Sequence, residues 1–278
     1  MFELLKYYLS FSFVQYALIV GVLVSLCSGL LGVILVLKRF AYIGDGLSHV
    51  AFGVMSVAMC LNMVDNMLLT IPVTIIVAIL LIKDGSNRKL TGDTALAMLS
   101  VGSMAFGYLI INVFATSSNI AGDVCSALFG ATSILTLSSQ DVKISVAMSL
   151  IVICIFIIYY NKIFTVTFDE TFAKATGIKT DKYNLLIAVI TAIVIVIAMN
   201  LVGALLVSAL IIFPAVSAMT LFHQFNYVVI LSGCLSIFNS AAGIIISILF
   251  STPVGATIVM TSVATFFILK ILSLLIKR

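Results

Sequence analysis

A carboxylate and an imidazole four residues apart form the pair in this sequence that is best suited to chemistry. Asp45 and His49 lie in the stretch from Lys38 to Gly53, which has long apolar segments on both sides. On a helix this spacing puts both side chains on one face, one turn apart. Ionisable residues inside membrane segments are costly and are by default functional candidates. A carboxylate oxygen with an imidazole nitrogen is a ligand set for Zn²⁺, Mn²⁺ or Fe²⁺.

A simpler interpretation of the same pair is also open. Asp45 could cap the helix that follows it, and His49 could be a polar residue that is satisfied near the helix end. Gly44 and Gly46 flank the aspartate, and a residue without a Cβ lets another backbone come close. From the residues alone, a metal-contacting pair and a helix cap are therefore two alternatives.

The composition is that of a membrane protein. The chain has 278 residues, of which 63% are hydrophobic and 9% charged, with a mean hydropathy of +1.33. Soluble proteins carry roughly 25% charged residues. We therefore expect an all-α polytopic membrane protein in contact with lipid, with residues 1–278 forming one transmembrane domain. Met1–Ser12 lacks the features of a removed signal peptide, and the five scattered cysteines are typical of packing residues.

Apolar runs of about 20 residues predict the membrane spans. Nine such runs lie approximately at Val14–Leu37, Gly44–Leu61, Met67–Ile82, Thr94–Phe114, Ser145–Tyr160, Leu185–Leu201, Gly203–Phe222, Tyr227–Phe250 and Gly255–Ile276. The third run is short, and only a Val-Gly pair separates the sixth from the seventh. Eight spans are therefore the alternative to nine.

Basic residues predict the orientation, because cytoplasmic loops are enriched in Lys and Arg. With nine spans and an outside N-terminus, only Lys6 and Lys143 fall outside. The other basic residues fall in cytoplasmic connections or at a cytoplasmic C-terminal end. The stretch Ala115–Gln140 is mildly apolar but rich in small polar residues, which indicates a short outside helix or re-entrant segment, or alternatively a crossing.

Small residues recur in the first span. Gly21, Ser25 and Gly29 follow one another at intervals of four, which allows close helix packing in lipid. Chance in a glycine- and serine-rich helix is the competing explanation. Pro214 removes a backbone donor in the seventh span and should kink it.

The longest cytoplasmic connection, about 161–182, is polar and predicts a short surface helix. Thr167 and Glu170 have capping-box spacing, and Gly177 stands where the helix should stop. We expect a helix of roughly Phe168–Thr176, with Phe168 and Phe172 on one side. These two phenylalanines fit a protein docking surface and a lipid-surface contact equally well.

Several function classes lack their motifs in this sequence. There is no phosphate loop, no HExxH zinc motif and no nucleophile elbow, so we do not expect an enzyme. The sequence also has no basic patch interleaved with aromatic residues, so it does not indicate binding to nucleic acid.

Taken together, the motifs resemble those of the permease subunits of zinc and manganese ATP-binding-cassette (ABC) importers, over nearly the whole chain. The stretch Lys38-Arg39-x-x-x-x-Gly44-Asp45-x-Leu47-x-His49 looks like the signature segment of that family. Further similar motifs are Asp93-Thr94-Ala-Leu, Asp123-x-x-x-x-Leu128-Phe129-Gly130, Ala173-x-x-x-Gly177, Val202-Gly203-Ala-Leu-Leu, Pro214-Ala215 and Thr252-Pro253-x-Gly255. Their order and spacing together are specific.

The resemblance implies a type II ABC importer permease in a bacterial cell membrane, moving Zn²⁺ or Mn²⁺, with Fe²⁺ a third candidate. It implies a homodimer, cytoplasmic ATPase subunits and an extracytoplasmic metal-binding protein as partners. Asp45 and His49 of both protomers would contact the ion transiently, and no cofactor would be bound permanently. The coupling loop would use Phe168, Glu170, Phe172, Ala173 and Gly177 to contact the ATPase.

Two rival functions have specific requirements. A permease for a siderophore or cobalamin chelate needs a wide, weakly liganding pathway, which the Asp45/His49 pair argues against. An autonomous ion-coupled transporter should show inverted repeats and carboxylates at the membrane centre in both halves. Only Asp45 is an acidic residue well inside a predicted span, which argues against the second rival.

Overall fold

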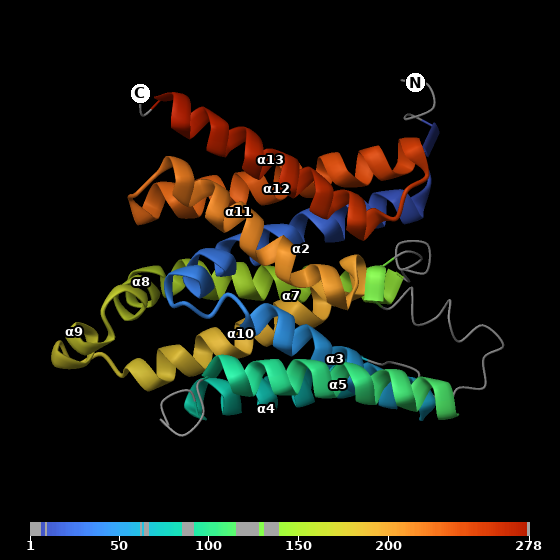
Figure 1. Cartoon of the computed structure of the whole chain (residues 1–278), viewed down its shortest axis with the longest axis horizontal. Helices are drawn as coiled ribbons and strands as arrows, with labels where there is room; N and C mark the ends of the chain where they lie inside the picture. The colour runs from blue at the N-terminus through green and yellow to red at the C-terminus, as the bar shows by residue number, and fades with distance from the viewer. Residues whose placement is uncertain are drawn as a thin grey trace.

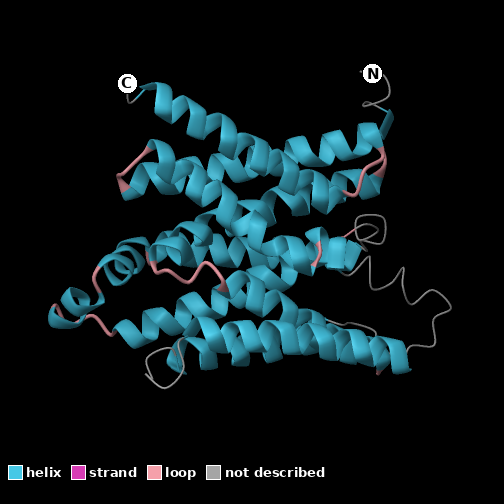
Figure 2. Ribbon diagram, viewed as in Figure 1, coloured by secondary structure: helices cyan, strands magenta, loops and turns pink. Residues whose placement is uncertain are grey.

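The computed structural model describes residues 7–8, 10–61, 63, 67–84, 92–114, 128–130 and 139–276. Over these residues the regular secondary structure is helical, and the long helices run roughly along the longest axis of the molecule (Figures 1 and 2). The helices are α2 (Ser12–Leu37), α3 (Ile43–Cys60), α4 (Met67–Asp84), α5 (Gly92–Phe114), α7 (Ser139–Ile158), α8 (Tyr160–Phe168), α9 (Glu170–Ala175), α10 (Thr180–Val202), η1 (Ala204–Leu206), α11 (Val207–Leu221), α12 (Phe225–Phe250) and α13 (Val254–Ile276).

Each of the nine predicted apolar runs corresponds to one of these helices. Eight helices of the described chain are long and apolar enough to cross a membrane, and the apolar part of α4, Met67–Leu81, is shorter. The predicted all-α polytopic bundle is therefore confirmed, and α4 is the helix that separates a count of eight from a count of nine. Most of the stretch Ala115–Gln140 lies outside the described residues, so the prediction for it stays a prediction.

Helix α2 is packed closely against α12 through its small residues. A Cβ on Gly29 would come within 1.9 Å of the Ser236 hydroxyl oxygen, and one on Gly21 within 2.7 Å of Ile244. Ser25 is fully buried between these glycines and donates a hydrogen bond to the Val22 carbonyl. The absence of side chains at Gly21 and Gly29 thus permits the short distance between the two helices.

Helix α3 is held against α5 by a second set of close contacts. A Cβ on Gly53 would lie 2.9 Å from the Ser103 carbonyl oxygen, and one on Gly107 would lie 2.9 Å from the Phe52 ring. Phe52 itself is fully buried. Because both glycines are required for this approach, the position of α3 along α5 is well defined.

The break between the sixth and seventh runs lies where the sequence predicts it. Helix α10 ends at Val202, and Gly203 follows with a φ of +88°, a backbone conformation that side chains disfavour. The short helix η1 then leads into α11. Pro214 is buried inside α11, which the structure describes as one continuous helix from Val207 to Leu221.

The connection 161–182 differs from the prediction, because it holds two helices instead of one. Asp169 separates α8 from α9 and caps α9, since its carboxylate accepts a hydrogen bond from the Phe172 N–H at 2.9 Å. Thr167 does not cap α9, because its hydroxyl donates to the Ile163 carbonyl within α8. The expected helix of Phe168–Thr176 and its Thr167/Glu170 capping box are therefore wrong. Phe168 ends α8, and Phe172 lies on α9.

The end of α9 matches the expected stop signal. Gly177 has a φ of +82°. The N–H groups of Gly177 and Ile178 donate to the carbonyls of Lys174 and Ala173, at 3.1 and 3.0 Å. This pair of bonds is the Schellman motif, in which glycine is favoured because it tolerates positive φ.

Candidate functional site

A tight turn at the C-terminal end of α2 determines where α3 begins. Arg39 has a φ of +61°, unusual for a residue with a side chain, and its N–H donates to the Val36 carbonyl at 3.1 Å. The N–H of Phe40 donates to the Leu35 carbonyl at 2.8 Å, which completes a second Schellman motif. The chain then enters α3, with Asp45 in its first turn and His49 one turn later.

The structure brings the Asp45 and His49 side chains together. His49 Nε2 lies 3.8 Å from Asp45 Oδ1. The Asp45 side chain is 42% exposed, whereas that of His49 is almost entirely buried. A separation of 3.8 Å is too long for a hydrogen bond but is short enough for both atoms to contact one ion.

A third side chain, Ser100 of α5, contacts both members of the pair. Its hydroxyl oxygen lies 3.2 Å from Asp45 Oδ2 and 2.9 Å from His49 Nδ1. Ser100 comes eight residues after Gly92, the first residue of α5, which corresponds to about 12 Å along the helix. The Asp45/His49 pair on α3 therefore lies beside α5 about two turns in from the N-terminal end of α5.

The free ring nitrogen of His49 is the most informative atom of the site. Nε2 is buried and has no hydrogen-bond partner, and such a group normally has one. The Asp45 carboxylate oxygen Oδ1 lies 3.8 Å from it. Among the described residues there is no group of three or more Cys, His, Asp and Glu side chains that could hold a metal ion. One chain therefore offers two ligand atoms here.

The two glycines beside Asp45 face helices of the same chain. A Cβ on Gly46 would lie 2.7 Å from the Leu96 side chain of α5, and one on Gly44 would lie 3.3 Å from Ile211 of α11. Ser48 is fully buried and donates a hydrogen bond to the Asp45 carbonyl at 2.9 Å. The two glycine contacts fix the first turn of α3 and leave the Asp45 carboxylate accessible.

Three other motif segments meet at a second place, far from one another in sequence. A Cβ on Gly203 would lie 2.4 Å from the Leu128 carbonyl oxygen and 2.5 Å from the Gly130 nitrogen. A Cβ on Gly255 would lie 2.3 Å from the Val202 carbonyl oxygen. Glycine is needed at both positions because backbones approach each other, so these motifs have a packing role.

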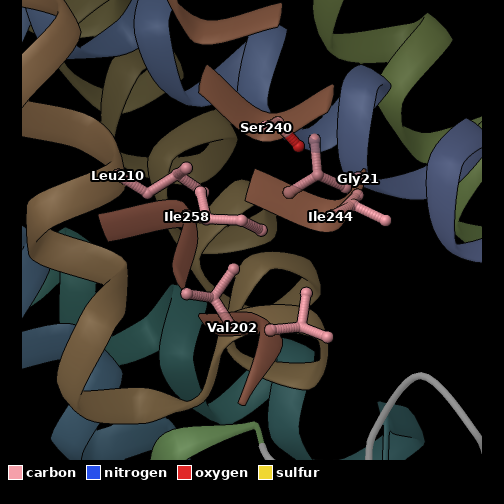
Figure 3. Close-up of a pocket in the computed structure, with 8 residues that line it drawn as sticks. Gly21, Val202, Leu210, Ser240, Ile244 and Ile258 are labelled. Atoms are coloured by element: carbon pink, nitrogen blue, oxygen red, sulfur yellow. The ribbon is translucent and has the colours of Figure 1, made fainter. Parts of the chain in front are cut away.

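A small cavity lies near the Gly203 contact but lacks metal ligands. It is lined by Gly21, Val24, Val202, Leu210, Ser240, Ile244, Val254 and Ile258, most of which Figure 3 shows as sticks. Ser240 supplies the single polar side chain of this lining. The cavity is therefore apolar and distinct from the Asp45/His49 pair.

The expected coupling residues divide into exposed and buried ones. Phe168 and Phe172 are both more than half exposed, whereas Ala173 is fully buried. Glu170 forms an ion pair with Lys174 at 2.9 Å, and this contact lowers the pKa of the Glu170 carboxyl. Helices α8 and α9 lie at one end of the bundle, as the left side of Figure 1 shows.

Two contacts in and near the site join residues far apart in the chain, so the spacing of residues in the sequence did not predict them. Ser100 lies 55 residues after Asp45 and looks like one more small polar residue in an apolar run. The one feature of the local sequence that points to Ser100 is its place about two helical turns after Asp93, the first residue of the Asp93-Thr94-Ala-Leu motif. The second is the hydrogen bond from the Lys38 ammonium to the Asn184 side chain of α10.

Comparisons with known proteins agree with the fold and the motifs. Residues 10–273 match the model of a family described as "ABC 3 transport family". The manganese import system permease protein ScaB of Streptococcus gordonii is 27% identical over 258 residues, covering 93% of this chain and 90% of ScaB. The high-affinity zinc uptake system membrane protein ZnuB of Haemophilus influenzae is 28% identical over 252 residues, covering 90% and 94%.

A solved structure is similar over the same length. The structure of PsaBC from Streptococcus pneumoniae in complex with Fab matches with a TM-score of 0.86 and 27% sequence identity, covering 99% of both chains. This similarity and the family match confirm the resemblance to ABC importer permeases. Since the family model spans almost the whole sequence, the chain belongs to the ABC 3 transport family.

Proposed function

We propose that this protein is the membrane permease subunit of an ABC importer that moves a divalent transition metal ion, Mn²⁺ or Zn²⁺, into the cytoplasm. The names of ScaB and ZnuB supply these two metals. Asp45 and His49 contact the ion during its passage. The observation that carries the proposal is the buried, unpartnered Nε2 of His49, 3.8 Å from a carboxylate oxygen, inside a transport protein.

The same pair supports a homodimer. Two protein ligands are too few for a metal site, and a two-fold axis would double them to two carboxylates and two imidazoles. Asp45 keeps 42% of its side chain exposed, which leaves room for a second copy. The adjacent α5 exposes apolar residues, among them Met98 and Val101, and Gly102 has nothing within 4 Å of an added Cβ. We infer that α5 of one protomer faces the other protomer.

The partners follow from the ends of the bundle. Phe172, exposed on α9, is the residue best placed to enter a groove on a cytoplasmic ATPase subunit. An extracytoplasmic metal-binding protein would deliver the ion at the opposite end. The C-terminal helix α13 ends on the side of α9, and α2 begins on the other side (Figure 1). With the basic connections in the cytoplasm, this arrangement supports an outside N-terminus and a cytoplasmic C-terminus in a bacterial cell membrane.

Metal-resolved uptake tests the function. The chain is reconstituted in liposomes with its ATPase and binding protein, and Mn²⁺, Zn²⁺ and Fe²⁺ compete for transport. Asp45→Asn keeps the shape and removes the charge, and His49→Ala removes the nitrogen. Loss of a residue that only hydrogen-bonds to a metal ligand typically costs 10–100-fold in metal affinity. Because Asp45→Asn and His49→Ala change the ligands themselves, we expect each to lower uptake by roughly 100-fold or more.

The matched control is Ser48→Ala, which removes a buried hydroxyl three residues from Asp45 without touching either ligand side chain. It should retain most of the uptake, and all three variants should still assemble with the ATPase. Near-parental uptake by a protein that carries both Asp45→Asn and His49→Ala would overturn the metal-contacting role. Uptake of none of the three metals by the parent complex would overturn the transport function.

A further inference from the structure

The position of the Ser100 hydroxyl between Asp45 and His49 determines which of the three side chains donates each hydrogen bond. Its hydroxyl has a single proton, and it lies within hydrogen-bond distance of a carboxylate oxygen, Asp45 Oδ2, and a ring nitrogen, His49 Nδ1. An ionised carboxylate can only accept hydrogen bonds. Both contacts are hydrogen bonds only if Ser100 donates to Asp45 and accepts from an N–H at His49 Nδ1.

This direction determines the state of the other ring nitrogen. A neutral imidazole carries one proton, so a proton on Nδ1 leaves Nε2 with a bare lone pair. That lone pair is buried without a partner and lies 3.8 Å from Asp45 Oδ1. Two electron-rich atoms therefore face each other at a distance where a cation can bind both.

We propose that Ser100 is a positioning residue that holds the neutral His49 ring as the Nδ1–H tautomer and presents Nε2 to the metal ion. The inference rests on the proposed metal-contacting role of Asp45 and His49 and adds the residue that prepares them. Without the Ser100 hydroxyl, the ring is free to carry its proton on Nε2. That proton would occupy the side of the ring on which the ion binds.

The geometry also makes Ser100 a link between two helices. Asp45 and His49 lie on α3, whereas Ser100 lies on α5 and is itself buried. Its hydroxyl fixes the carboxylate through Oδ2 and the ring through Nδ1, so that Oδ1 and Nε2 remain as the free pair. The outer partners of a metal-binding histidine typically act in this way, by fixing tautomer and ring orientation.

A spectroscopic test reads the tautomer without any metal. The chain has two histidines, so ¹⁵N-histidine labelling gives two imidazole rings, and the exposed His223 serves as an internal reference. Spectra are recorded at a pH about two units above the ordinary imidazole pKa. The parent should show a bare Nε2 and a protonated Nδ1 for His49. Ser100→Ala should shift His49 toward the Nε2–H form and leave His223 unchanged.

A binding test shows whether the tautomer matters for the ion. Binding of Mn²⁺ to the purified permease–ATPase complex is followed by the loss of the free-ion EPR signal. Ser100→Ala should weaken binding by roughly 10–100-fold, as expected for loss of an outer partner. Ser100→Thr keeps the hydroxyl and should restore binding to near the parental value. Ser48→Ala removes a buried hydroxyl from α3, next to His49 in the chain, and should leave binding unchanged.

The outcomes separate this inference from the proposed function. An unchanged His49 tautomer in Ser100→Ala would overturn the role of Ser100, whatever the metal data show. A changed tautomer together with Mn²⁺ binding as tight as that of the parent would overturn the claim that the tautomer serves the metal. If the parent binds no Mn²⁺ and Asp45→Asn still transports, the metal-contacting role itself fails, although the tautomer result stands.

Discussion

The Lys38 ammonium at the end of α2 donates a hydrogen bond to the Asn184 side-chain oxygen on α10. Lys38 is half-buried, and burial lowers the pKa of its ammonium, which the nearby Glu170 carboxylate opposes. Glu170 lies on α9, and Asp45 follows Lys38 by only seven residues in the chain. The end of the bundle that holds α9 is therefore connected to the start of α3 through the Lys38–Asn184 hydrogen bond.

Lys38→Met tests this connection. Methionine keeps most of the apolar stem and removes the hydrogen bond, so movement of α9 should reach α3 less effectively. We expect several-fold less uptake per ATP hydrolysed in the reconstituted complex, with the ATPase rate itself preserved. Lys179→Met, at an exposed position on the same end, is the control and should leave the ratio unchanged. Equal ratios in both variants would show that Lys38 does not take part in coupling.

Phe172→Asp tests the proposed contact between α9 and the ATPase. Phe172 is 59% exposed, and an aspartate would place an unpaired charge in any apolar contact, at a cost of several kcal/mol if buried. Co-purification of the ATPase should fall sharply while membrane insertion is retained. Phe250→Asp makes the same change at the exposed C-terminal end of α12 and should retain the ATPase. Full retention by Phe172→Asp would instead favour a contact with lipid.

Gly102→Leu tests the face of α5 at which we place the second protomer. A side chain at Gly102 meets nothing within 4 Å in the single chain, and leucine is the better helix former by about 0.5–1 kcal/mol. The variant should therefore insert and fold but lose the dimer, as measured by native mass spectrometry in detergent. A stable dimer of Gly102→Leu would place the interface elsewhere.

Gly203→Ala should destabilise the bundle. The φ of +88° and ψ of 154° lie in a region that is essentially restricted to glycine, which costs about 1–3 kcal/mol for other residues. The added Cβ would also lie 2.4 Å from the Leu128 carbonyl oxygen. Gly177→Ala also places alanine at a positive φ but meets no neighbour within 4 Å, so it is a control without the steric contact. Thermal unfolding should show a clearly larger loss for Gly203→Ala, and equal losses would contradict the contact with Leu128.

The orientation can be tested by labelling from outside the cell with a membrane-impermeant maleimide. In a cysteine-free background, Lys179→Cys should not react, because its connection is rich in basic residues and should be cytoplasmic. Ser251→Cys, exposed in the connection between α12 and α13, should react. Reaction at Lys179→Cys together with protection at Ser251→Cys would show that the orientation is the reverse of the one predicted.

Local patterns predicted the spans and the Asp45/His49 pair, because apolar runs and a spacing of four residues depend on neighbouring residues alone. The cap of α9 was missed because Thr167 and Glu170 match a spacing rule, although Asp169 is a cap of at least equal strength. Ser100 and Asn184 were missed because each contacts a residue on another helix, and no local period encodes such a contact. The position of Asp45 within the bundle depends on the turn at Arg39 and on the packing of α3 against α5.

The position of Asp45 in the first turn of α3 has a consequence for the proposed contact with an ion. The N-terminus of a helix carries a partial charge of roughly +0.5, and Asp45 lies in that turn. Part of the carboxylate charge is therefore compensated by the peptide dipoles of its own helix before a cation arrives. A divalent ion meets a weaker field there than it would from the same carboxylate at a helix C-terminus. If the pair contacts the ion as proposed, the dipole favours release of the ion over tight binding.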